Sequence, residues 1–136
     1  MPRRPKALVL DSWAVLAYLE DEASGPKVAD IIAGAQERPS ALMMSVVNAG
    51  EVWYILARQV SEAEADRALA ELCHLGVQLV DADWNMVRLA GAIKAKRRMS
   101  YADCFAAALA KHTKADLVTG DKEFRQIENE IKILWL

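Results

Sequence analysis

A chain of 136 residues, 54% hydrophobic and 26% charged, has the size and composition of one folded domain and not of a disordered protein. The formal net charge of −2 lacks the strong basic excess of many nucleic-acid-binding proteins. Charged residues also interrupt every apolar run before it reaches about 20 residues, the length of a membrane-spanning helix. We therefore expect a single soluble domain over residues 1–136.

The two cysteines, Cys73 and Cys104, have no metal-binding spacing, and no secretory signal precedes the first apolar run. We expect both to be buried free thiols in a cytoplasmic protein.

The first predicted elements alternate between strand and helix. The apolar run Ala7–Leu10 predicts a strand, and the apolar spacing after Asp11 predicts a helix. Ser24 is placed to cap a second helix, which the segment Arg38-Pro39-Ser40 ends.

The middle of the chain repeats this pattern. Ala41–Met44 predicts a strand and Val46–Gln59 a helix with one apolar face. Ser61-Glu62-Ala63-Glu64 is a capping box, and the helix that it opens should end at Gly76, where glycine can take a positive φ. Val77–Val80 predicts the next strand.

The last third begins with two helices. Asp83 can cap a helix that runs toward the basic segment Lys94–Arg98, and Ser100 can cap another at Tyr101–Lys111. A strand at Asp116–Thr119 follows.

A short helix near Glu123–Ile127 and a strand at Ile131–Leu134 complete the pattern. Strands that alternate with helices predict a three-layer α/β/α sandwich with a short, five-stranded parallel sheet and right-handed crossovers.

Four acidic residues fall near one edge of this predicted sheet. Ligands of such sheets bind beyond the carboxyl ends of the strands. Asp11 follows the first strand, Asp121 follows the fourth, Asp103 lies in the first turn of a helix, and Glu51 lies farther along its helix. Each acid also has an ordinary structural explanation, as a helix cap, a turn residue or a solvated side chain.

Carboxylates that meet repel one another, so such a cluster implies raised pKa values or a bound cation. Oxygen ligands suit Mg²⁺ or Mn²⁺, and an ion of this kind keeps waters, one of which can attack a phosphodiester. Basic residues that could contact phosphates also cluster locally, at Arg3, Arg4 and Lys6, at Lys94–Arg98, and at Lys111 and Lys114.

Other chemistries lack their motifs. The chain has no phosphate-binding loop, dinucleotide fingerprint, serine-hydrolase elbow or zinc-protease helix. A haloacid-type phosphatase needs a second Asp two residues after the first, where this chain has Trp13, and a receiver domain needs an acidic pair that is also absent.

The whole chain resembles the PIN-domain family, and within it the VapC-type toxins of toxin–antitoxin pairs. The resemblance rests on four segments in order: Val9-Leu10-Asp11-Ser12, Asn48-Ala49-Gly50-Glu51-Val52, Tyr101-Ala102-Asp103-Cys104 and Leu117-Val118-Thr119-Gly120-Asp121-Lys122-Glu123-Phe124. Trp13 is a departure, since the family commonly has a small polar residue there.

The resemblance implies a ribonuclease that uses Mg²⁺ or Mn²⁺. By analogy, Asp11 and Asp103 would bind the principal metal, Glu51 would orient it or its water, and Asp121 would act through water or at a second metal. The matching polar neighbours are Ser12, Asn48 and Thr119.

The resemblance also implies partners: an RNA substrate, a cognate antitoxin protein and a second copy of the chain in a homodimer. The helix around Trp53 and Tyr54 is a candidate for either protein interface. The alternative is a non-catalytic interaction module that uses the acidic pocket to bind protein or RNA.

Overall fold

The computed structural model describes residues 7–37 and 41–136. The basic residues Arg3, Arg4 and Lys6 and the predicted helix end at residues 38–40 lie outside the described residues.

Five short parallel strands form one sheet in the order β3-β2-β1-β4-β5. Its strands are β1 (Leu8–Leu10), β2 (Leu42–Ser45), β3 (Val77–Val80), β4 (Asp116–Thr119) and β5 (Ile133–Trp135). β1 is central, because it pairs with β2 on one side and β4 on the other. The carboxyl ends of these three strands therefore lie side by side.

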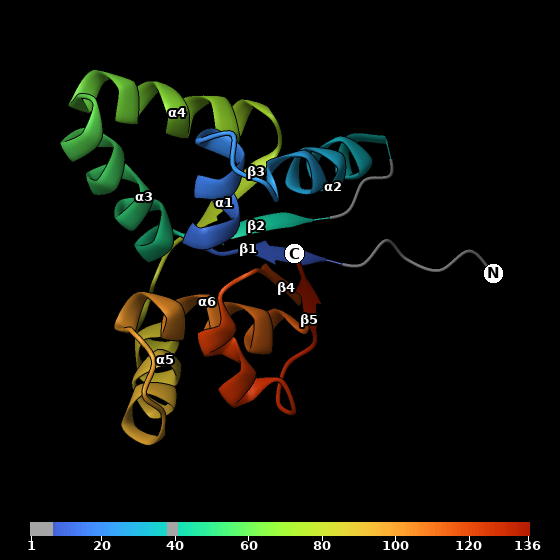
Figure 1. The fold of residues 1–136 in the computed structure, drawn as a ribbon. Helices are drawn as coiled ribbons and strands as arrows, with labels where there is room; N and C mark the ends of the chain where they lie inside the picture. The colour runs from blue at the N-terminus through green and yellow to red at the C-terminus, as the bar shows by residue number, and fades with distance from the viewer. Residues whose placement is uncertain (1–6, 38–40) are drawn as a thin grey trace.

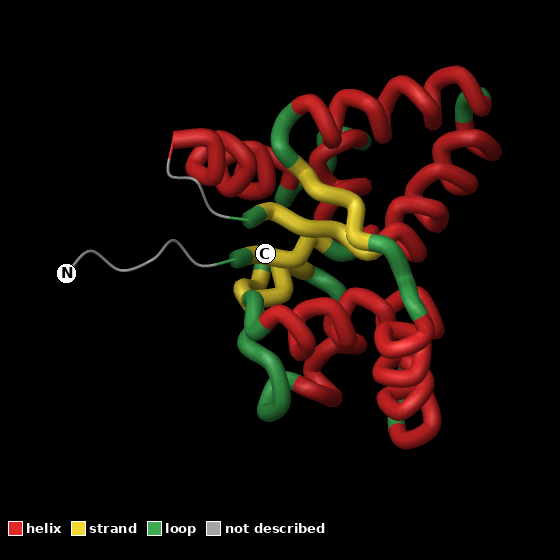
Figure 2. Tube along the Cα trace, turned by 180° about the vertical axis from the view of Figure 1, so that it is seen from behind, coloured by secondary structure: helices red, strands yellow, loops and turns green. Residues whose placement is uncertain are grey.

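Helices cover both faces of the sheet (Figure 1), and the reverse view in Figure 2 shows the same separation into layers. One face carries α1 (Ser12–Leu19), α2 (Gly25–Glu37), α3 (Val46–Gln59) and α4 (Glu62–His74). The other carries α5 (Trp84–Lys96), α6 (Tyr101–Thr113) and the 3₁₀ helix η1 (Lys122–Ile127). The predicted three-layer α/β/α sandwich is confirmed.

The helices begin at the capping residues that the sequence predicts. The side chains of Asp11, Ser61, Asp83 and Ser100 each accept a hydrogen bond from a backbone N–H in the first turn of their helix. Gly76, just beyond α4, has a φ of 104°, a conformation that glycine adopts without a steric penalty.

Two apolar clusters fill the spaces between the sheet and its helices. Val9 belongs to the cluster under α5 and α6, and its neighbour Leu10 to the cluster under α1–α4, because successive side chains of a strand point to opposite faces. In α6 every residue from Cys104 to Ala110 is buried, and four of these seven are alanines, which allow close packing.

Two expectations need correction. The last strand begins at Ile133 and not at Ile131, since the N–H of Ile131 still bonds to the carbonyl of Ile127 (3.2 Å) in the turn that leaves η1. Cys104 is buried as expected, but Cys73 is exposed, because its position in α4 faces solvent; both are free thiols. In the described part of the chain, no helix is long and apolar enough to cross a membrane.

Candidate active site

Asp11 occupies the junction between β1 and α1, and both oxygens of its carboxylate accept hydrogen bonds. Oδ1 accepts from the backbone N–H of Ala14 (2.8 Å), which caps α1. Oδ2 accepts from the hydroxyl of Thr119 (2.5 Å). The residue is only 1% exposed. Asp11 is therefore a helix cap, and it is also held rigidly at the carboxyl edge of the sheet.

Thr119 joins two of the candidate acids. It is the last residue of β4, the strand beside β1, and is fully buried. Its hydroxyl donates to Asp11 and accepts from the backbone N–H of Asp121 (3.0 Å). Asp121 in turn accepts from the N–H of Glu123 (3.0 Å) and so caps η1. One hydroxyl group thus fixes the segments of Asp11 and Asp121 relative to each other.

Asn48 makes a second connection, between three helices. Its side-chain amide donates to the hydroxyl of Ser12 in α1 (3.2 Å) and to the carbonyl of Ala102 in α6 (3.1 Å). The Ser12 hydroxyl donates to the carbonyl of Asn48 (3.3 Å). Asn48 is completely buried, and its Oδ1 atom has no hydrogen-bond partner among the described residues. The amide therefore lies between the neighbours of Asp11 and Asp103, with one acceptor unused.

Asp103 and Glu51, the two predicted acids that lie within helices, are partly buried. Asp103 lies in the first turn of α6, where its backbone N–H donates to the Ser100 hydroxyl (3.1 Å). Glu51 lies in α3, three residues after Asn48. The negative charges of Asp121, Glu51 and Glu123 all act on Asp103, and those of Asp103 and Asp121 act on Asp11. The four predicted acids therefore form one electrostatically coupled group.

The electrostatics of this group oppose ionisation. Burial raises the pKa of Asp11 to about 7, against the lowering effect of the hydrogen bonds from Thr119 and Ala14. Burial, and then the charge of Asp121, raises the pKa of Asp103 to about 6. A cation at this edge would offset both shifts.

The residues fit a hard divalent cation held through few carboxylates. Among the described residues, no group of three or more His, Cys, Asp and Glu side chains is arranged as a ready-made metal cage. Mg²⁺ usually binds only one or two carboxylates and keeps several waters. The coupled acids supply such oxygens, and the unused Oδ1 of Asn48 can accept a hydrogen bond from a water in the site.

Sequence reasoning missed one member of the group. Glu123 was not among the predicted site residues, although its charge contributes to the raised pKa of Asp103. Its position two residues after Asp121 could have marked Glu123 as a member of the site, but an acid in the first turn of a helix is also common as a solvated residue.

The sequence matches the PIN domain family over residues 8–130. Comparison with curated protein sequences finds no match.

Solved structures with a similar fold have low sequence identity. Mycobacterium tuberculosis VapC20, described as a sarcin–ricin loop cleaving toxin, is 20% identical, with a TM-score of 0.70 and coverage of 88% of this chain and 94% of that one. A chain of VapBC2 from Rickettsia felis, bound to a promoter DNA fragment, is 18% identical, with a TM-score of 0.73 and coverage of 96% and 98%. A chain of DNA-bound VapBC from Salmonella typhimurium is 15% identical, with a TM-score of 0.78 and the same coverage. These likenesses show a shared fold.

Proposed function

The chain belongs to the PIN-domain family, and from this premise we propose that it is a metal-dependent endoribonuclease that hydrolyses RNA phosphodiester bonds, the toxin of a type II toxin–antitoxin pair. One observation carries the proposal. Asp11, Glu51, Asp103 and Asp121 come from four separate segments of the chain, yet they form one coupled group at the carboxyl edge of the sheet. Acids with a purely structural role are not expected to gather where each raises the free energy of the ionised form of its neighbours.

We assign the metal, Mg²⁺ or Mn²⁺, to Asp11 and Asp103, with Glu51 and Asp121 acting on it through water or at a second ion. When bound, such an ion supplies Lewis-acid stabilisation of the charge that develops on the phosphate and lowers the pKa of water. Thr119 holds the Asp11 carboxylate in place before any ligand arrives. That preorganisation reduces the free energy needed to assemble the site.

The remaining polar groups orient the segments that carry the acids. Asn48 fixes Ser12, beside Asp11, against Ala102, beside Asp103. The raised pKa of Asp103, about 6, lies close to neutrality. A bound cation would offset this shift, so that the carboxylate is ionised at neutral pH and available as a metal ligand.

The proposed protein partners are a cognate antitoxin and a second copy of the chain, in the cytoplasm. Structural neighbours named as VapBC complexes support the antitoxin. On α3, Trp53 donates a hydrogen bond to Asp66 of α4 (2.9 Å), whereas Tyr54 is 45% exposed beneath Arg58. Tyr54 therefore faces outward and is available for either interface.

The decisive experiment is cleavage of single-stranded or loop RNA by the purified protein. We expect cleavage with Mg²⁺ or Mn²⁺, none with EDTA, and none by Asp103→Asn, which should still fold. Asp30→Asn, which removes an exposed acid of α2, is the matched control and should cut like the parent. If Asp103→Asn cuts RNA as well as the parent, the site assignment is wrong. If the folded parent binds RNA or an antitoxin but cuts no RNA, the chain is instead a non-catalytic interaction module.

A further inference from the structure

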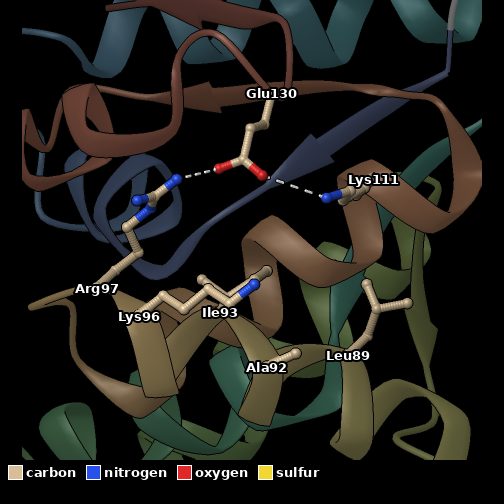
Figure 3. Close-up of a pocket in the computed structure, with 7 residues that line it drawn as sticks. All are labelled: Leu89, Ala92, Ile93, Lys96, Arg97, Lys111 and Glu130. Atoms are coloured by element: carbon tan, nitrogen blue, oxygen red, sulfur yellow. Dashed lines mark hydrogen bonds and ion pairs between the residues drawn. The ribbon is translucent and has the colours of Figure 1, made fainter.

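Two basic segments that are separate in the sequence meet on one surface of the structure. Lys96 is the last residue of α5 and Arg97 follows it, and Lys111 lies near the end of α6, the helix packed against α5. With Glu130 they form the charged rim of a cavity of about 220 Å³, and apolar residues of α5 form the rest of its lining (Figure 3). We call this cavity the α5–α6 basic groove.

Glu130 already places a carboxylate in the groove, between two cations. Its Oε2 atom accepts from Arg97 (2.6 Å), and its Oε1 atom accepts from Lys111 (3.4 Å), as the dashed lines in Figure 3 mark. Both interactions lower the pKa of Glu130, with the Arg97 hydrogen bond as the largest cause. Arg97 and Lys111 are therefore positioned so that both can contact oxygen atoms of one anionic group.

The charges on the rim do not balance. Three cations, from Lys96, Arg97 and Lys111, face the single carboxylate of Glu130, although the whole chain carries a net charge of −2. The planar fork of an arginine and the ammonium of a lysine are the usual partners of phosphate oxygens. This local excess matches a phosphate group and would repel a metal ion.

We propose that the α5–α6 basic groove binds the phosphate backbone of the RNA substrate at a distance from the cleaved bond; this inference rests on the ribonuclease function proposed above. α6 links the two places, because Asp103 is in its first turn and Lys111 comes eight residues later. At 1.5 Å per residue the separation along the helix axis is about 12 Å, roughly the length of four stacked nucleotides. A strand that leaves the acids along α6 reaches the groove within that length.

The competing explanation is structural: Glu130 ties the segment before β5 to α5 and α6. The variant Glu130→Gln separates the two explanations. If the groove binds phosphate, removal of a competing carboxylate raises the local charge and tightens RNA binding. If Glu130 is only a tether, RNA affinity stays at the parent value while stability falls.

The first test measures binding of a single-stranded RNA of about 20 nucleotides as a function of salt. It uses the full chain with Asp103→Asn, without metal, so that binding is separated from cleavage. Lys96→Gln and Lys111→Gln should each weaken binding by about threefold or more and reduce the slope of log affinity against log salt by about one. Glu130→Gln should tighten binding by a similar factor.

A matched ion pair on the opposite face supplies the controls. Arg67 and Glu64 of α4 form an exposed pair at 2.7 Å, on the other side of the sheet. Arg67→Gln and Glu64→Gln change the net charge by the same amounts and should leave RNA affinity and its salt dependence nearly unchanged. Equal effects of the groove variants and these controls would overturn the proposal, because the effect would then come from net charge alone.

The second test uses cleavage, with RNA length as the variable. For an RNA of about 20 nucleotides, Lys111→Gln should raise KM and leave kcat unchanged; for one of about two nucleotides, which spans roughly 7 Å and is too short to reach the groove, parent and variant should have equal KM and kcat. If the parent cuts both RNAs and Lys111→Gln has the parent's KM on the long one, the groove proposal fails and the ribonuclease stands. If the folded parent cuts neither RNA with Mg²⁺ or Mn²⁺, the ribonuclease proposal fails, and the groove proposal fails with it.

Discussion

The indole ring of Trp13 lies against Gly120 so closely that its Cη2 atom is 2.2 Å from the point that a β-carbon on residue 120 would occupy. Two further ring atoms lie 2.3 and 2.7 Å from the same point. Trp13 follows Asp11 by two residues, and Gly120 immediately precedes Asp121. The ring therefore packs the two acid-bearing segments together, and it requires glycine at position 120.

This contact predicts the behaviour of Gly120→Ala. The added methyl group must displace the ring, so we expect a loss of about 1–3 kcal/mol in the free energy of unfolding, together with slower RNA cleavage. In the double variant Trp13→Ala/Gly120→Ala the methyl group has space, and its additional cost should largely disappear. Urea unfolding of the four proteins measures this coupling.

Gly34→Ala is the control for this comparison of Trp13 and Gly120 variants. Gly34 lies in the exposed middle of α2, where an added β-carbon meets no atom within 4 Å, so alanine should stabilise the helix by about 0.5–1 kcal/mol. A Gly120→Ala protein as stable as the parent would contradict the packing that the structure describes.

Asp11 should make the metal-free protein less stable as the pH rises. Its ordinary pKa is 3.8 and its folded-state pKa is about 7, so between these values the folded protein binds more protons than the unfolded chain. Stability then falls from about pH 4 to about pH 7, by up to about 4 kcal/mol for this buried group. Asp11→Asn removes the charge and should be more stable than the parent at pH 8 in EDTA, with a smaller advantage at pH 5.

Urea unfolding at several pH values checks this prediction. Asp30→Asn, an exposed substitution, should follow the pH dependence of the parent. An Asp11→Asn protein that is less stable than the parent at pH 8 would show that the hydrogen bonds from Thr119 and Ala14 outweigh the burial of the charge.

Local sequence signals predicted most of the fold because helix caps and apolar periodicity act over a few residues. Ser61 and Ser100 each bond to the backbone N–H three residues later, as the capping pattern requires. The predicted start of β5 was wrong because the turn that follows η1 continues to Ile131, whose N–H bonds to the carbonyl of Ile127, and apolar character does not reveal this difference.

The site was less predictable, because its contacts join residues that are distant in the sequence. A sequence can place Asp11 after a strand, but the bond from Thr119, 108 positions away, depends on β1 and β4 being neighbours. The contact between Trp13 and Gly120 has the same origin, and only the departure from the family pattern at Trp13 marked the position in advance.

Thr119 should act as a positioning residue. Thr119→Val keeps the shape but leaves the Asp11 oxygen and the Asp121 N–H without their partner, which should cost about 1–3 kcal/mol of stability and lower kcat. The cost should be greater at pH 8 than at pH 5, since the lost bond stabilised the ionised form of Asp11. Thr119→Ser retains the hydroxyl and should therefore have most of the stability and kcat of the parent.

The matched control for this substitution is Thr113→Val. It removes a hydroxyl that donates to the carbonyl of Leu109 (2.7 Å) near the end of α6, away from the acids. It should leave kcat unchanged. A Thr119→Val protein with the parent's kcat would show that the hydroxyl does not position Asp11 for the reaction.

Metal binding should appear as stabilisation, independently of cleavage. A ligand that binds only the folded state adds about 3 kcal/mol to its stability at a concentration 100-fold above Kd. Mn²⁺ or Mg²⁺ should therefore raise the Tm of the parent and of Asp30→Asn, and EDTA should reverse the rise. Asp103→Asn has one carboxylate fewer at the coupled acids and should show a smaller rise at the same ion concentration. An equal rise in Asp103→Asn and the parent would mean that the ion binds elsewhere, because loss of a true ligand must weaken its affinity.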